Sequence, residues 1–187
     1  MSTNDWRKKL PMWFTYSRML LAIPILALMT IDSIAARWAA CVLFGLASVT
    51  DYYDGYFARK YDASTNMGKF MDPVADKILV SAILVMLVVQ NLIDPYMVVL
   101  IITRDTLIGG LRSVAAADQI VIAAKPAGKW KTAMQMLAIP FLILGPKVWT
   151  FFPLHQVGYG ALWLSTVLSL TSGWEYYQGY QEAIKNK

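Results

Sequence analysis

Four aspartates form two pairs whose spacing would let them hold metal ions together. Asp51 and Asp54 are i,i+3 neighbours, and Asp72 and Asp76 are i,i+4 neighbours. On helices, the side chains of each pair would share one face, with Cβ atoms about 5–6 Å apart. Carboxylate oxygens are the ligands that hard divalent cations prefer, and two such ions would offset the four negative charges. We therefore expect two divalent metal ions, Mg²⁺ or Mn²⁺, at a cage formed by two helices.

A second group of chemically active residues is basic. Arg104 and Arg112 lie in one apolar segment, and Lys129 and Lys131 lie near the start of the next. An arginine within an apolar segment is costly without an anionic partner, so we expect this group to bind a phosphate. Lys129 and Lys131 are two positions apart and point to different faces of an intact helix. We expect one to face the site and the other to reach lipid head groups, with Lys129 converging with Arg112 and Lys131 pointing elsewhere.

The alternative for the lysines is the general bias that places basic residues on the cytoplasmic side of a membrane. A further acid, Asp105, directly follows Arg104. Because i,i+1 neighbours do not face each other on a helix, a direct pair between them is not expected. Asp105 still needs a partner, which the sequence does not name.

The elements that must position these residues are apolar helices. The chain has 187 residues, of which 57% are hydrophobic and only 16% charged, and this composition indicates one integral membrane domain over residues 1–187. We predict an all-α bundle of six transmembrane helices of about 20 residues each, preceded by a short interfacial segment at residues 2–10. The expected spans are 13–31, 36–59, 72–92, 95–117, 128–144 and 156–177.

The basic residues also predict how the bundle is oriented. With the N-terminus on one side, nearly all of the 17 basic residues fall on that side, whereas Arg37 and Lys147 fall on the other and Arg104 lies within a span. The positive-inside rule then places both termini and the acidic motif in the cytoplasm. The net charge of +5 is read as contact with anionic lipids. Nucleic-acid motifs are absent from the sequence, so no nucleic-acid partner is expected.

The acidic motif resembles the signature of the CDP-alcohol phosphotransferase family. Eight residue types at fixed spacing carry the resemblance: Asp51, Asp54, Gly55, Ala58, Arg59, Gly68, Asp72 and Asp76. The resemblance implies that Asp51, Asp54 and Asp72 are metal ligands, and that Asp76 shares the second metal and acts as the general base. It also implies nucleotide contacts from Asp54, Gly55, Ala58, Arg59 and Gly68. Gly55 and Ala58 are small, which permits close approach of either a ligand or a neighbouring helix.

The stretches 103–112 and 128–132 are most similar to the bacterial phosphatidylglycerophosphate synthases of that family. This likeness implies CDP-diacylglycerol as donor, sn-glycerol 3-phosphate as acceptor, CMP as leaving group and a homodimer in the bacterial cytoplasmic membrane. The acceptor phosphate would be bound by Arg104, Arg112, Lys129 and Lys131. Met12 departs from the pattern, because the subgroup usually has asparagine there, between residues equivalent to Pro11 and Thr15.

Two alternatives remain open from the sequence. A sister transferase would use another acceptor, such as inositol phosphate or serine, and a neutral acceptor would not need the basic group. A transporter or channel would instead spread its acids through the membrane depth and break its helices at repeat positions. Here the four aspartates of the motif bunch at one end of two expected spans, which favours the enzyme.

Overall fold

The fold is known from a computed structural model that describes residues 5–60, 66–118, 120, 126–148 and 153–185. Within these ranges, some helical segments are described by their backbone and not by their side chains. These segments are residues 5–16, 18, 51–60, 66–73, 75–76, 126–127, 129 and 146–147.

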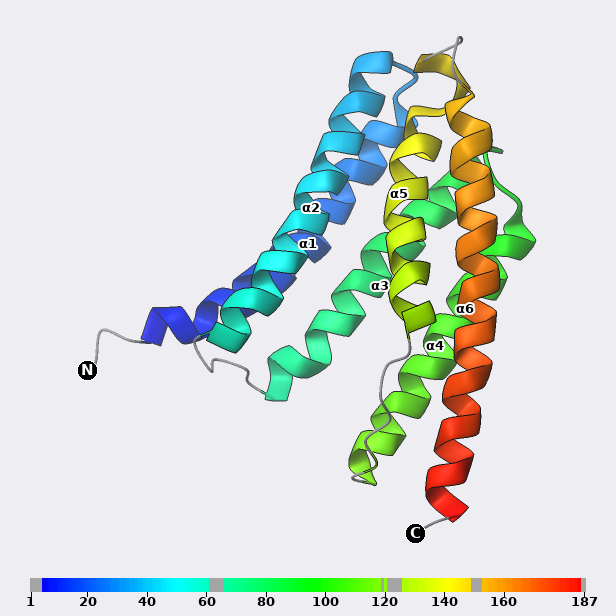
Figure 1. Cartoon of the computed structure of the whole chain (residues 1–187). Helices are drawn as coiled ribbons and strands as arrows, with labels where there is room; N and C mark the ends of the chain where they lie inside the picture. Colours follow the sequence, from blue (N-terminus) through cyan, green and yellow to red (C-terminus); the bar gives the residue numbers. More distant parts are fainter. Residues whose placement is uncertain (1–4, 61–65, 119, 121–125, 149–152, 186–187) are drawn as a thin grey trace.

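The described residues form six helices and contain no strand, as predicted for an all-α chain (Figure 1). The helices are α1 (Asp5–Thr30), α2 (Ile34–Lys60), α3 (Asn66–Val89), α4 (Pro95–Ala117), α5 (Pro126–Val148) and α6 (Leu154–Lys185). The bounds of α4 agree with the sequence prediction. Residues 5–10 of the predicted interfacial segment at 2–10 form the first turns of α1, and their place at a membrane interface stays a prediction. In the part of the chain described, no helix combines the length and the hydropathy needed to cross a membrane.

Helix α6 is the element that organises the second half of the bundle. It packs along α5 and also along α4, while α1 packs against α2 and α3, and α2 packs against α5. We expected α4 and α5 to be direct neighbours because their connection is short. Instead, α6 is the main packing partner of both (Figure 1). Side chains on α4 and α5 therefore meet beside a face of α6, which the sequence prediction had left without a role.

Close approach of α5 and α6 depends on a glycine. A Cβ built on Gly158 would lie 2.9 Å from the Cβ of Phe141 and 3.1 Å from the carbonyl oxygen of Ala138. The second contact is with backbone, which cannot rotate away as a flexible side chain can. Gly158 thus sets the distance between these two helices.

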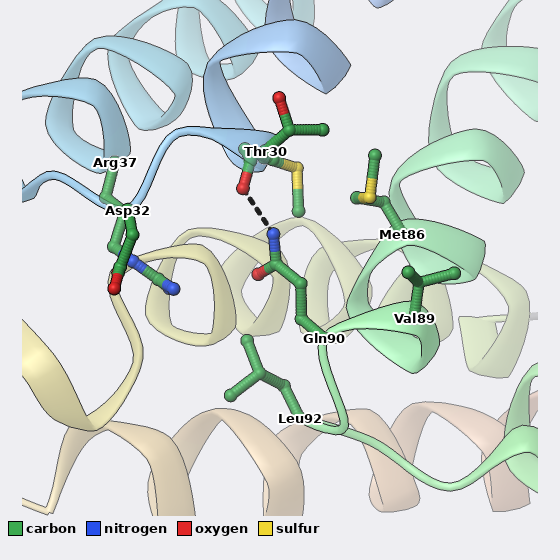
Figure 2. A pocket seen from close by; sticks show the side chains of 8 residues that line it. Thr30, Asp32, Arg37, Met86, Val89, Gln90 and Leu92 are labelled. Carbon is green, nitrogen blue, oxygen red and sulfur yellow. Dashed lines mark hydrogen bonds between the residues drawn. The ribbon is translucent and has the colours of Figure 1, made fainter.

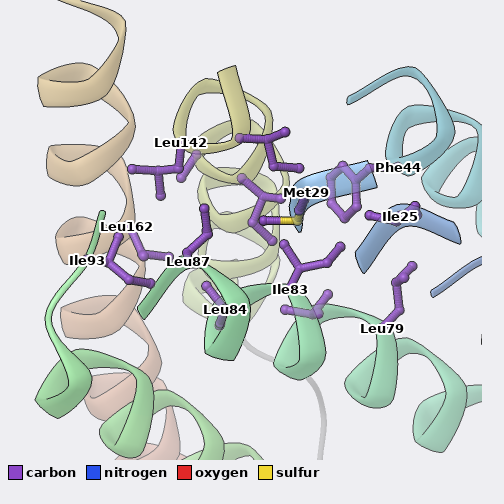
Figure 3. Close-up of a cluster of buried hydrophobic side chains, with 14 of the residues drawn as sticks. Ile25, Met29, Phe44, Leu79, Ile83, Leu84, Leu87, Ile93, Leu142 and Leu162 are labelled. Carbon is purple, nitrogen blue, oxygen red and sulfur yellow. The ribbon is translucent and has the colours of Figure 1, made fainter. Parts of the chain in front are cut away.

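All six helices contribute side chains to the core (Figure 3). Helix α3 contributes a stripe at helical spacing in which Leu79, Ile83, Leu84 and Leu87 are fully or almost fully buried. Phe44 of α2 is buried in the same cluster. The stripe fixes the rotation of α3 about its axis, and hence the direction in which Lys77 leaves it.

The turn between α3 and α4 is defined by local backbone chemistry. Asn91 adopts φ 57°, the left-handed conformation that commonly ends a helix. The Leu92 N–H then donates to the carbonyl oxygen of Leu87 at 2.9 Å, as in a Schellman motif. Helix α4 restarts at Pro95, whose missing N–H is harmless in the first turn. Asp94 precedes it in an extended conformation, but its carboxylate accepts a hydrogen bond from Tyr159 of α6 rather than capping α4.

At the same end of the bundle, Gly145 interrupts α5 with φ 59° and ψ −167°. This break agrees with the predicted end of the helix at 145–146. It frees the carbonyl oxygen of Ile143, which accepts a hydrogen bond of 2.9 Å from Nη1 of the buried Arg37. Next to Arg37 lies a cavity of about 440 Å³, lined also by Met86 and Gln90 (Figure 2). This cavity is at the end of the bundle opposite the acidic motif.

Candidate active site

The acidic motif lies where α2 ends and α3 begins. Asp51 and Asp54 fall in the last turns of α2, and Asp72 and Asp76 fall in the first half of α3. The helical backbone therefore gives each pair the i,i+3 or i,i+4 register that the sequence predicted. Figure 1 shows that the end of α2 and the start of α3 are at the same end of the bundle. Helix α3 begins before Gly68, so Asp72 and Asp76 lie inside the helix rather than at its start.

The side chains of these aspartates lie outside the described set, as do the side chains of Ala58, Arg59 and Met12 and the surroundings of Gly55 and Gly68. Among the side chains that are described, no group of three or more His, Cys, Asp or Glu residues could hold a metal ion. The donor types at residues 51, 54, 72 and 76 are all carboxylates, and this fits Mg²⁺ or Mn²⁺. The register of both helices is compatible with a shared cage.

Lys77 connects the acidic motif with the basic group. It directly follows Asp76, so the Cα atoms of the two residues are about 3.8 Å apart. Its Nζ donates a hydrogen bond of 2.6 Å to the backbone carbonyl oxygen of Asp105 on α4. A Cβ at Gly109 would collide with this ammonium group. Gly109, one turn after Asp105, thus leaves the space through which Lys77 reaches α4.

Arg104 is held by three hydrogen bonds from its guanidinium group. Nε donates to the carbonyl oxygen of Ser169 at 2.7 Å, and Nη2 donates to the hydroxyl oxygen of Ser172 at 2.9 Å, both on α6. Nη1 lies 3.0 Å from Oδ1 of Asp105. The expectation that Arg104 and Asp105 do not pair is therefore wrong. The long arginine side chain curls back, so the angle between Cα–Cβ directions at i,i+1 does not keep the charged ends apart.

A glycine on α6 makes room for Arg104. A Cβ at Gly173 would lie 2.9 Å from Nε of Arg104 and 3.4 Å from its Cγ. Together with Ser169 and Ser172, Gly173 forms a polar notch on α6 that fits one guanidinium group. The notch supplies hydrogen-bond acceptors, which the N–H groups of an arginine inside an apolar bundle require.

Asp105 also receives the ammonium group of Lys131. Lys131 Nζ and Asp105 Oδ1 form an ion pair, and the Lys131 residue is only 7% exposed. The backbone carbonyl oxygen of Lys131 accepts a hydrogen bond of 3.0 Å from Ser165 of α6. The expectation that Lys131 points away from the basic group is wrong: it faces the interior and reaches α4. The side chain of Lys129 lies outside the described set, so its convergence with Arg112 stays a prediction.

Arg112 has a different environment. It is exposed, and its guanidinium carbon lies 5.4 Å from the ring centroid of Tyr176 on α6. A cation–π contact of this kind orients the guanidinium group without using its N–H donors. Among the described contacts of Arg112, none uses the donors with which it could bind a phosphate.

The interior basic group has an excess of positive charge. Among the side chains that the structure describes, Lys77, Arg104 and Lys131 contact one acid, Asp105. In their ordinary charge states, three positive charges less one negative charge leave a net charge of +2. Such an excess in a partly buried site favours a dianion, and a phosphate monoester near pH 7 carries about −1.5 to −2.

Sequence reasoning missed the contribution of α6. The residues that contact the arginines, Ser169, Ser172, Gly173 and Tyr176, follow the i, i+3, i+4, i+7 spacing of one helix face. That polar stripe within an apolar helix is the signal that could have found them. Lys77 was also assigned no role, although its position next to Asp76 was visible.

The chain is similar to proteins with assigned names. The sequence model of the CDP-alcohol phosphatidyltransferase family matches residues 8–171, so the chain belongs to that family. A protein of Bacillus subtilis is 44% identical over 152 residues, which cover 80% of this chain and 77% of that protein. A protein of Rickettsia bellii is 38% identical over 172 residues, covering 91% of this chain and 94% of that protein. Both relatives are named CDP-diacylglycerol–glycerol-3-phosphate 3-phosphatidyltransferase.

Proposed function

We propose that this protein transfers the phosphatidyl group of CDP-diacylglycerol to a hydroxyl of sn-glycerol 3-phosphate, giving phosphatidylglycerophosphate and CMP. Family membership and the names of the relatives support the reaction. The observation that carries the choice of acceptor is the interior basic group with its net charge of +2, formed by Lys77, Arg104, Lys131 and Asp105. Serine carries no phosphate and would leave this charge uncompensated.

The donor would bind at the acidic motif. Asp51, Asp54, Asp72 and Asp76 would hold two divalent ions, Mg²⁺ or Mn²⁺, which would orient the pyrophosphate and lower the cost of charge on CMP. Asp54, Gly55, Ala58, Arg59 and Gly68 would contact the nucleotide. The registers of α2 and α3 support this assignment, since each pair shares a helix face and both pairs lie toward the same end of the bundle.

Asp76 would act as the general base. It takes the proton of the acceptor hydroxyl while the hydroxyl oxygen forms a bond to the phosphorus that carries diacylglycerol. The bond from that phosphorus to the oxygen of CMP breaks, and CMP leaves with both electrons. Because Lys77 follows Asp76 and contacts α4, the base and the interior basic group are close along the chain. Positioning and charge stabilisation then account for most of the catalysis.

The acceptor phosphate would be bound by Arg104, Arg112, Lys129 and Lys131. Arg112 has its N–H donors available, and a planar guanidinium group can bind two phosphate oxygens at once. Arg104 and Lys131 are anchored by α6 and by Asp105, which fixes where their remaining donors lie. These residues come from α4 and α5. Arg104, Arg112 and the backbone of Lys131 contact α6.

We further propose that the chain is a multi-pass protein of the bacterial cytoplasmic membrane, one domain over its length, and a homodimer. Large apolar side chains on the outside of every helix support a lipid environment. Examples are Leu20, Val42, Val85, Val99, Leu137 and Leu164. The distribution of basic residues supports a cytoplasmic acidic motif and cytoplasmic termini. The acyl chains of the donor would enter laterally from the bilayer.

The test of the function is an acceptor panel. The purified protein in detergent, with CDP-diacylglycerol and Mg²⁺, is offered glycerol 3-phosphate, inositol phosphate or serine. We expect lipid product and CMP with glycerol 3-phosphate only. If product formed with inositol phosphate alone, the proposed metal site would stand and the proposed acceptor would be replaced. Release of CMP with serine alone would contradict the role assigned to the basic group.

A further inference from the structure

One carboxylate oxygen organises two of the cations that face it. Oδ1 of Asp105 lies 3.0 Å from Nη1 of Arg104 and also pairs with Nζ of Lys131. The three side chains are 19%, 16% and 8% exposed, respectively, so solvent screens these contacts only weakly. Asp105 itself is fixed on α4, and its backbone carbonyl oxygen accepts from Lys77. The acid thus lies at a junction of α3, α4 and α5.

The contacts leave donors free on both cations. A guanidinium group has five N–H donors on three nitrogens. The described contacts of Arg104 use one donor on each nitrogen, which leaves two. An ammonium group has three N–H donors, and the described contacts of Lys131 use one. The remaining donors belong to Arg104 and Lys131, whose positions are already fixed by Asp105 and α6. A lysine side chain that is not already held in place loses rotamer entropy when it binds a ligand.

We propose that Asp105 is a positioning residue for the acceptor: it holds Lys131 and Arg104 so that their free donors meet one phosphate group of the acceptor. This inference rests on the proposed function, because it takes the acceptor to be a phosphate monoester. Asp105 does not contact the phosphate, which it would repel. It acts through the two cations, and it lowers the local charge to the +2 that a dianion balances.

The direction of the change in KM for glycerol 3-phosphate distinguishes positioning by Asp105 from simple charge attraction. Replacing Asp105 by Asn removes one negative charge, so the site becomes more positive. If charge alone governed acceptor binding, the KM for glycerol 3-phosphate would fall. If Asp105 positions the cations, that KM rises, because Lys131 loses the charged partner that orders it.

Steady-state kinetics of Asp105→Asn in detergent, with each substrate varied in turn, tests this. We expect the KM for glycerol 3-phosphate to rise about tenfold, the change that loss of a charged hydrogen bond produces, with the KM for CDP-diacylglycerol within about twofold of the parent. Asp105→Glu keeps the charge but moves the carboxylate by one methylene group. It should raise the acceptor KM by a smaller factor, whereas charge alone predicts no change.

Glu182→Gln is the matched control. It makes the same change of charge on α6, and none of the described contacts of Asp105, Arg104 or Lys131 involves Glu182. We expect its acceptor KM to equal that of the parent. If Asp105→Asn fails to fold, Asp105→Glu alone decides the question by the same measurement.

Other results would overturn the inference. An unchanged or lower acceptor KM in both Asp105 variants would do so, even if the melting temperature fell, because Asp105 would then only brace the helices. If Lys131→Ala still raised the acceptor KM in that case, the proposed function would stand without this role for Asp105. If Arg104→Ala, Arg112→Ala and Lys131→Ala all left acceptor saturation unchanged, the proposed acceptor site itself would fail.

Discussion

At the scale of single residues, the basic side chains differ in how much of their bonding capacity the protein already uses. Arg104 is committed to α6 and Asp105 by three contacts. Lys131 is buried and paired with Asp105. Arg112 has only the ring of Tyr176 beside it among the described contacts. Arg112 is therefore the residue best placed to respond directly to a bound phosphate.

This difference predicts the behaviour of Arg112 variants. Arg112→Ala removes a charged hydrogen-bond partner that contributes about 1.5–3 kcal/mol. We expect the KM for glycerol 3-phosphate to rise about ten- to a hundredfold, with the KM for CDP-diacylglycerol little changed. Arg112→Lys should recover only part of the loss, because an ammonium group cannot copy a planar fork. Equal increases in both KM values would show that Arg112 does not serve the acceptor specifically.

The helical registers of the acidic motif were visible in the sequence. The spacing of Asp51, Asp54, Asp72 and Asp76 predicted their helical registers, which the backbone of α2 and α3 has. The partner of Asp105 was not predictable. It required knowing that Lys131, on a later helix, faces inward, and that Arg104 bends back to its own neighbour. Such contacts depend on helix rotation and neighbour order, which local spacing does not determine.

At the scale of helices, hydropathy located the elements better than it located their ends. The bounds of α4 were predicted correctly because Asp94 and Pro95 give a clear signal for the start of a helix. Hydropathy placed the start of α3 too late, since residues 66–71 are too polar to count as a span although they form helix. Likewise α6 continues to Lys185, well beyond its apolar part. The length of an apolar run reflects how much of a helix lies in an apolar environment. The length of the helix itself is set by backbone hydrogen bonding, which continues into polar residues.

The pairing of α5 and α6 leads to a prediction about glycine. Gly158→Ala places a methyl group 3.1 Å from the backbone oxygen of Ala138, so the helices must separate. We expect a loss of about 1–3 kcal/mol in the free energy of unfolding, the usual cost of overpacking. A lower melting temperature in detergent, followed by circular dichroism, would show it.

Gly160 provides the control on the same helix. A Cβ there meets nothing within 4 Å, so Gly160→Ala should be neutral or stabilise the helix by up to about 1 kcal/mol. If Gly158→Ala and Gly160→Ala melted at the same temperature as the parent, the close approach of α5 and α6 would not limit stability.

At the scale of the whole molecule, the two ends of the bundle have different chemistry. One end holds the acidic motif, and the other holds the α1–α2 and α3–α4 turns beside the cavity at Arg37. The proposed orientation puts the first end in the cytoplasm. Alternating helices with short connections then bring the two termini to that side as well.

Cysteine labelling tests this orientation. In a Cys41→Ala background, we expect Ile31→Cys, in the α1–α2 turn, to react with an impermeant thiol reagent in intact cells. Ala117→Cys, at the opposite end of α4, should react only after the cells are opened. Both positions are exposed in the structure, so accessibility within the protein does not decide the outcome. The reverse pattern would place the acidic motif outside the cell.

Metal dependence tests the acidic motif as a unit. Four carboxylates concentrated toward one end of the bundle need cations to offset their repulsion. We expect activity to vanish with excess chelator and to return with Mg²⁺ or Mn²⁺. Asp51→Ala, Asp54→Ala and Asp72→Ala should each abolish turnover, while the melting temperature without metal should not fall. Full turnover in excess chelator would remove the two-metal proposal.

The most direct test of the central claim follows the CMP leaving group and the acceptor phosphate through the reaction. The purified protein is given Mg²⁺, CDP-diacylglycerol labelled in its cytidine and glycerol 3-phosphate labelled in its phosphorus. The proposed transfer predicts that acceptor phosphorus enters the lipid phase in a one-to-one ratio with labelled CMP in the aqueous phase. Labelled CMP without acceptor phosphorus in the lipid would contradict it, because the donor would then be cleaved without transfer to glycerol 3-phosphate.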